Sequence, residues 1–98
     1  MTELNSANDA LLLASKEGNL EGVKLALANG ADVNFADGEG ANALMRSVSR
    51  NHIEIVQLLL EQGADVHAVN KWDYSALKYS IKLNWKEMQE ILRDAGAS

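Results

Sequence analysis

The chain has 98 residues, with 14 Asp and Glu against 9 Lys and Arg, and it contains neither cysteine nor proline. A hydrophobic content of 47% with 23% charged residues excludes a disordered or membrane-embedded chain, and the length allows one domain. Without cysteine there is no disulfide, no thiolate metal ligand and no cysteine nucleophile. The formal net charge of −5 opposes general nucleic-acid binding.

The N-terminal residues Met1–Asn5 contain no basic segment and no apolar run of signal-peptide length. Apolar runs elsewhere are far shorter than the ~20 residues that a membrane span requires. We therefore expect a cytoplasmic protein that has no membrane partner.

An internal repeat organises the chain. Gly30–Val33 recurs 33 residues later as Gly63–Val66. The alignment of residues 10–34 with residues 43–67 gives ten identities in 25 positions, and residues 43–65 with 76–98 give eight in 23. Chance would give about one or two identities in either alignment, so a period of 33 residues predicts three stacked units.

Each period opens with a predicted helix. Before each apolar run stands a residue of a type that caps helix N-termini: Asp9, Asn42 and Ser75. The same helix should end where Gly or Asn can adopt a left-handed backbone, at Gly18, Asn51 and Asn84.

A second helix follows in each period. Its first turn carries a carboxylate that the helix dipole favours: Glu21, Glu54 and Glu87. It should end at the next glycine: Gly30, Gly63 and Gly96. An irregular segment then connects the periods, at residues 31–41 and 64–74.

The apolar residues follow helical spacing. Leu44, Ser47 and Val48 form an i, i+3, i+4 stripe, and residues 55–60 form another. A helix of about ten residues cannot bury such a stripe alone, and stacking one helix pair on the next solves that problem. The sequence therefore predicts a solenoid.

The period of 33, the segment Gly30–Asn34 and the run Asn51–Leu60 resemble the ankyrin repeat, over about residues 8–98. The family's Thr-Pro-Leu-His helix opening appears here as Asn42–Met45 and Ser75–Lys78, without the Pro and the His. The resemblance implies an all-α ankyrin-repeat solenoid of stacked helix-turn-helix units with protruding β-hairpin-like fingers. We expect a single domain over residues 1–98, with approximate repeats 8–40, 41–73 and 74–98.

The outer repeats differ from the middle one. The third has Lys86, Gln89 and Arg93 where the second has apolar residues, and the first has Gly22 and Ala26 where the second has Ile and Leu. A solenoid needs water-compatible ends, so we expect an N-capping, an internal and a C-capping unit in a complete chain. Three repeats are near the minimum, so we expect modest stability.

Chemistry-bearing motifs are missing from the sequence. It has no dinucleotide-binding glycine motif, no phosphate-binding loop and no nucleophile elbow. His52 matches a structural position of the repeat and His67 precedes an irregular segment, so neither is expected to bind a metal. We predict no catalytic, cofactor-binding or metal-binding residues and therefore no enzyme activity.

The resemblance implies that finger tips and first helices line a concave groove that binds other proteins. The residues expected there include Leu13, Ser49, Leu83 and finger positions 38, 39 and 41. Aromatic and basic residues dominate binding hot spots and are the candidate partner-binding set: Arg46, Arg50, Lys71, Trp72, Tyr74, Tyr79 and Lys82.

These residues predict an interaction module that acts as an adaptor, inhibitor or docking protein. Its partner would be another protein with an acidic and apolar segment, bound by a monomer. In another interpretation Trp72 and Tyr74 cover the last repeat as a lid, and Trp85 is taken as packing of the C-terminal cap.

Two further functions stay open. Residues 1–40 have a charge balance of −5 and residues 41–98 a balance of zero. The basic cluster of the C-terminal half could therefore bind nucleic acid or another anionic ligand, and its residues are Arg46, Arg50, Lys71, Lys78, Lys82 and Lys86. A purely structural or self-associating role is the other possibility.

Overall fold

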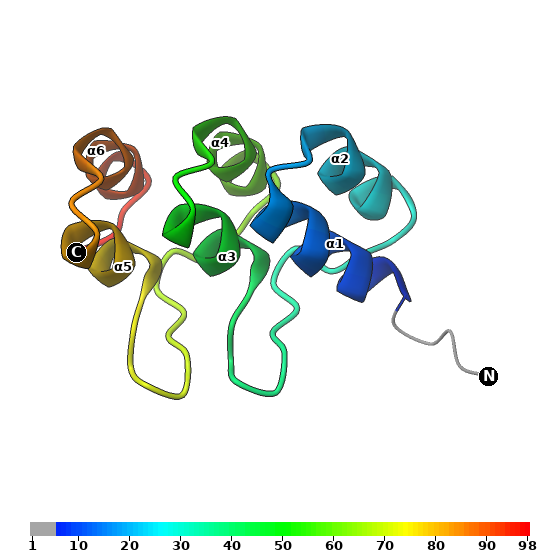
Figure 1. The fold of residues 1–98 in the computed structure, drawn as a ribbon, viewed down its shortest axis with the longest axis horizontal. Helices are drawn as coiled ribbons and strands as arrows, with labels where there is room; N and C mark the ends of the chain where they lie inside the picture. Colours follow the sequence, from blue (N-terminus) through cyan, green and yellow to red (C-terminus); the bar gives the residue numbers. More distant parts are fainter. Residues whose placement is uncertain (1–5) are drawn as a thin grey trace.

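Within residues 6–98, six helices form three antiparallel pairs that stand side by side along the long axis (Figure 1). The computed structural model describes residues 6–98, and Met1–Asn5 lie outside the described residues. The first helices of the pairs form one row and the second helices another. The helices are α1 (Ser6–Glu17), α2 (Leu20–Ala28), α3 (Ala43–Ser49), α4 (Ile53–Glu61), α5 (Ala76–Lys82) and α6 (Lys86–Asp94). The structure confirms the predicted all-helical solenoid.

The capping predictions are right for two of the three first helices. Asn42 Oδ1 accepts the Met45 N–H at 2.9 Å, and Ser75 Oγ accepts the Lys78 N–H at 3.1 Å. The prediction for Asp9 is wrong, because α1 begins at Ser6 and Asp9 lies inside its first turn. Finger bridges hold Asn42 and Ser75 in extended conformations, whereas no bridge holds Asp9 among the described residues.

The predicted helix ends are confirmed by the backbone angles. Gly18, Asn51 and Asn84 have φ values of 79°, 60° and 64° between the two helices of each pair. The glycines after the second helices have positive φ as well: Gly30, Gly63 and Gly96. The turns therefore lie where the period predicted them, at residue types that tolerate a left-handed backbone.

The core runs through all three pairs. Leu11, Leu44 and Leu77 lie one period apart and are all buried between first helices, and α1 packs on α3 as α3 packs on α5. Val56 and Leu59 of α4 are fully buried. The outer side of the third pair is polar instead, because the exposed Lys78 and Arg93 replace apolar residues of the second pair. No helix within residues 6–98 has the length and apolar character needed to cross a membrane.

Two fingers project from the row of first helices (Figure 1). Each is closed by one isolated antiparallel bridge, Ala36–Asn42 or Val69–Ser75, rather than by extended strands. The fingers contact each other where the Lys71 N–H donates to the Glu39 carbonyl at 2.9 Å. A Cβ at Gly40 would lie 3.0 Å from the Cα of Asn70, so this glycine allows the close approach.

Candidate functional site

The two fingers are held by side chains that occupy the same position of the period, Asp37 and Asn70. Asp37 Oδ1 accepts the N–H groups of Glu39 and Ala41 at 2.9 and 3.0 Å. Asn70 Oδ1 likewise accepts the N–H groups of Trp72 and Tyr74, at 2.9 and 3.0 Å. One Asx side chain thus shapes each finger turn.

The remaining atom of each Asx side chain ties its finger to the following first helix. Asp37 Oδ2 lies 2.6 Å from Arg46 Nη2, and Asn70 Nδ2 donates to Tyr79 Oη at 2.9 Å. Arg46 and Tyr79 are themselves one period apart. We call these two contacts the finger clasps. They mean that Arg46, a predicted partner-binding residue, is already paired within the protein.

The clasp also sets the protonation of Asp37. Partial burial by itself would raise the pKa of this carboxyl. The hydrogen bonds from Arg46, Ala41 and Glu39, together with the positive charge of Arg46, outweigh that effect and lower the pKa below its ordinary value. Asp37 is therefore a stable anion at neutral pH.

Aromatic residues of the second finger and of α5 surround a hollow of about 480 Å³ at the boundary between the second and third helix pairs. The rings of Tyr74 and Tyr79 are 4.9 Å apart at an interplanar angle of 47°. Trp72 and Leu83 are 55% and 41% exposed. We call this hollow the aromatic pocket, and its lining residues are Ser49, Trp72, Tyr74, Tyr79, Lys82 and Leu83.

Three lysines lie close to the aromatic residues of the pocket. Lys71 Nζ lies 4.7 Å from the Trp72 ring centroid, and Lys78 Nζ lies 4.7 Å from that of Tyr74. Lys82 lines the pocket itself. All three lysines are exposed, and none has a carboxylate oxygen within 4.0 Å among the described residues. We call Lys71, Lys78 and Lys82 the basic rim.

The structure therefore brings four of the seven predicted site residues together in one pocket: Trp72, Tyr74, Tyr79 and Lys82. Lys71 belongs to its rim, and Arg50 is exposed at the C-terminal end of α3, next to Ser49. The lid interpretation fails for Trp72, which remains more than half exposed. Tyr74 does fold back, onto the ring of Tyr79.

The organising residues Asp37 and Asn70 were not in the predicted set. The sequence does contain a signal for them, because an Asp or Asn stands at the same position of both periods, ahead of a tight turn. Side chains of this type accept hydrogen bonds from the backbone N–H groups of such turns. Lys78 was assigned only to the basic cluster. Its place beside Tyr74 depends on how the finger folds back.

The histidines and Trp85 make contacts within the fold. His52 Nε2 lies 3.0 Å from the Lys16 carbonyl oxygen and donates to it, and the ring lies over Gly18. The His67 N–H donates to Asp65 Oδ1 at 2.8 Å in a turn. Trp85 packs against the core at the start of α6, as expected. Within residues 6–98 there is no group of three or more His, Asp or Glu that could hold a metal ion.

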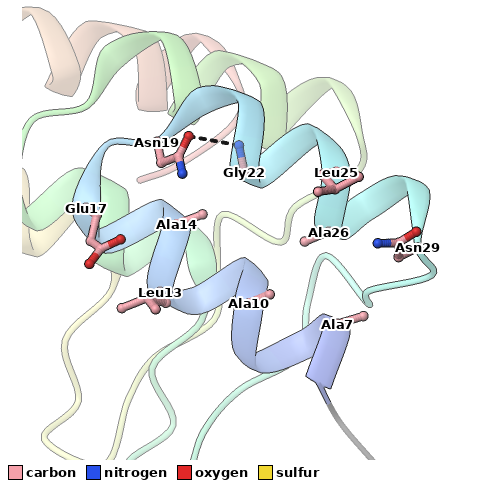
Figure 2. A pocket seen from close by; sticks show the side chains of 10 residues that line it. All are labelled: Ala7, Ala10, Leu13, Ala14, Glu17, Asn19, Gly22, Leu25, Ala26 and Asn29. Atoms are coloured by element: carbon pink, nitrogen blue, oxygen red, sulfur yellow. Dashed lines mark hydrogen bonds between the residues drawn. The ribbon is translucent and has the colours of Figure 1, made fainter. Parts of the chain in front are cut away.

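A larger hollow of about 720 Å³ lies between α1 and α2 (Figure 2). Ala14, Gly22 and Ala26 line it, with Leu13 and Leu25. One period later the first three positions are Ser47, Ile55 and Leu59, all buried by the preceding helix pair. The hollow thus lies on the end face of the solenoid, where small residues replace the larger ones of the second pair. The polar residues of its lining are Glu17, Asn19 and Asn29, and Asn19 Oδ1 already accepts the Gly22 N–H at 2.9 Å (Figure 2).

Comparison with known proteins supports the interpretation of the repeat. A family model described as "Ankyrin repeats (3 copies)" matches residues 7–98. The comparison with curated proteins finds no match.

Proposed function

Because the chain belongs to the ankyrin-repeat family, whose repeats are generally protein–protein interaction modules, we propose that it is a non-catalytic interaction module. It binds a partner protein through the concave surface formed by the fingers and the first helices. It acts as an adaptor, an inhibitor or a docking protein, as a monomer in the cytoplasm.

The observation that carries the proposal is the aromatic pocket. A tryptophan that is 55% exposed beside two tyrosines in tilted contact is costly to leave in water, and such residues supply most of the energy at binding hot spots. The finger clasp from Asn70 to Tyr79 holds the second finger in place before binding. Preorganisation of this kind lowers the entropy cost of association.

The chemistry of the pocket favours a partner segment that is apolar with acidic flanks. The basic rim has no acidic partner among the described residues, so its charges remain available to a ligand. Arg46 does not belong to this set, because Asp37 neutralises it. Exposed charges of this kind steer association and fix orientation more than they add affinity.

The test is partner capture from native lysate by wild type and by Trp72→Ala. We expect Trp72→Ala to weaken binding by about 2 kcal/mol or more, roughly a 30-fold loss, because it removes a hot-spot ring. Leu25→Ala is the matched control, since Leu25 is 63% exposed and lies on α2, away from the aromatic pocket. Equal capture by all three proteins would refute the proposal.

Two measurements separate the remaining possibilities. Sedimentation at two protein concentrations tests the monomer. Binding to a generic oligonucleotide tests the alternative of an anionic ligand, which requires a steep decline of affinity with salt.

A further inference from the structure

We propose that the aromatic pocket receives one large apolar side chain of the partner, and that carboxylates on both sides of this anchor pair with the basic rim. This inference rests on the proposed function. It adds which residue of the partner enters the protein and which residues flank it.

The hydrogen bonds around the pocket argue for an apolar anchor. Ser49 Oγ donates to the Arg46 carbonyl at 2.9 Å, and Tyr79 Oη accepts from Asn70. Trp72, Tyr74 and Leu83 contribute mostly carbon surface. A polar anchor would exchange water for a wall that is almost entirely carbon, and a polar group that is buried without a hydrogen-bond partner is destabilising.

The pocket is large enough for a large apolar anchor. A hollow of about 480 Å³ lies toward the small end of the ~300–1,000 Å³ typical of ligand pockets. It has room for one leucine-sized or phenylalanine-sized side chain with its neighbouring backbone, and its walls are held by the tyrosine pair and the clasp.

The positions of the lysines argue for acidic flanks on both sides. Lys71 comes from the finger tip and lies over Trp72, whereas Lys82 comes from the last turn of α5. A segment anchored between finger and helix therefore meets a cation in either direction. Because these lysines are exposed, the flanks should contribute less binding energy than the anchor does.

The experiment uses the peptide Gly-Glu-Glu-Leu-Glu-Glu-Gly, acetylated and amidated, titrated into the Trp85→Phe variant. Trp72 is then the single tryptophan, and its fluorescence reports the pocket directly. Trp85 Nε1 has no hydrogen-bond partner among the described residues, so phenylalanine removes no bond. If this variant does not fold, the Trp72 indole N–H resonance of the wild type is followed by NMR instead.

We expect the Trp72 emission to shift to shorter wavelength with saturation. Replacement of the central Leu by Phe should retain binding, and replacement by Ser should weaken it at least tenfold. Replacement of all Glu by Gln should weaken it by less than the Ser peptide does and abolish its salt dependence, and replacement by Lys should abolish binding. The double variant Lys71→Gln, Lys82→Gln should bind the original Glu peptide as weakly as wild type binds the Gln peptide.

Equal binding of the Ser and Leu peptides, or no binding of any peptide, overturns the inference. The proposed function still stands in either case if Trp72→Ala loses the captured partner. It fails separately if Trp72→Ala retains the partner fully.

Discussion

Three residues other than glycine have positive φ in the described structure, and one of them forms the tip of the second finger. Asp73 has φ 67° and lies one period after Gly40, which has φ 82°. A left-handed backbone is strained for a residue with a Cβ, although Asp and Asn tolerate it better than most. The second finger therefore retains a small strain that the first avoids.

Asp73→Gly should stabilise the protein by about 0.5 kcal/mol, because the strain of the left-handed residue exceeds the added freedom of the unfolded chain. Urea denaturation measures the change. Gly40→Ala is the opposite control and should destabilise the fold by about 1–2 kcal/mol, since its Cβ would lie 3.0 Å from Asn70 Cα. A destabilised Asp73→Gly protein would contradict the assignment of strain.

The charge of Asp37 gives a second prediction at this scale. A carboxyl whose folded-state pKa is lowered adds stability above its unfolded-state pKa and loses it as the pH falls through the folded-state value. Asp37→Asn should therefore cost about 0.5–1 kcal/mol at pH 7, and the difference from wild type should vanish in acid. Denaturant titrations from pH 7 to pH 2 test this. A difference that persists at pH 2 would show that charge is not its cause.

At the scale of elements, the two fingers are attached to the following first helices by different kinds of contact. Each finger must be held against the next first helix. Asp37 and Arg46 do this with an ion pair, whereas Asn70 and Tyr79 use a neutral hydrogen bond. The neutral version leaves the Tyr79 ring free to line the aromatic pocket.

Tyr79→Phe should cost about 1 kcal/mol of folding stability, because the amide of Asn70 loses its acceptor. Binding of the partner should weaken as well, because the second finger loses the clasp that preorganises it, but by less than in Trp72→Ala, since the ring that lines the pocket remains. Calorimetric melting and partner capture are the two measurements. A large loss of binding with unchanged melting would show that the hydroxyl contacts the partner itself.

At the scale of the whole molecule, stability comes from stacking, since each helix is too short to persist alone. The middle pair has neighbours on both sides, so among the described residues more of its side chains are buried than in either outer pair, Leu44 among them at 1% exposed. The end faces are treated differently. The outer side of the third pair carries exposed polar residues such as Lys78 and Arg93, and that of the first pair forms the hollow between α1 and α2.

Leu44→Ala should therefore cost about 3–5 kcal/mol, because the cavity lies between two stacked pairs that cannot both collapse into it. That is a large part of the ~5–15 kcal/mol that stabilises a domain. Leu13→Ala, at an exposed site of α1, should change the stability by less than about 0.5 kcal/mol. Denaturation curves of the two variants test the contrast, and equal losses would contradict a core built by stacking.

The sequence by itself determined the period, the turns and the stacked core. These depend on short-range chemistry that recurs every 33 residues, such as Asn42 capping its own helix or Gly30 ending one. Its one misplaced boundary, at Asp9, arose because the extended conformation of a cap is imposed by the finger bridge, a contact that Asp9 does not make within the described residues.

Only the tertiary structure decided which groove residues are available. Arg46 and Lys82 are both basic residues near the ends of first helices, yet one is paired with a finger carboxylate and the other borders a pocket. Trp72 and Tyr74 are two residues apart, yet Trp72 remains exposed whereas Tyr74 packs against Tyr79 of α5. The physical reason is that a side chain's partner depends on how a finger folds back onto a helix, and residue type at a repeat position does not specify that geometry.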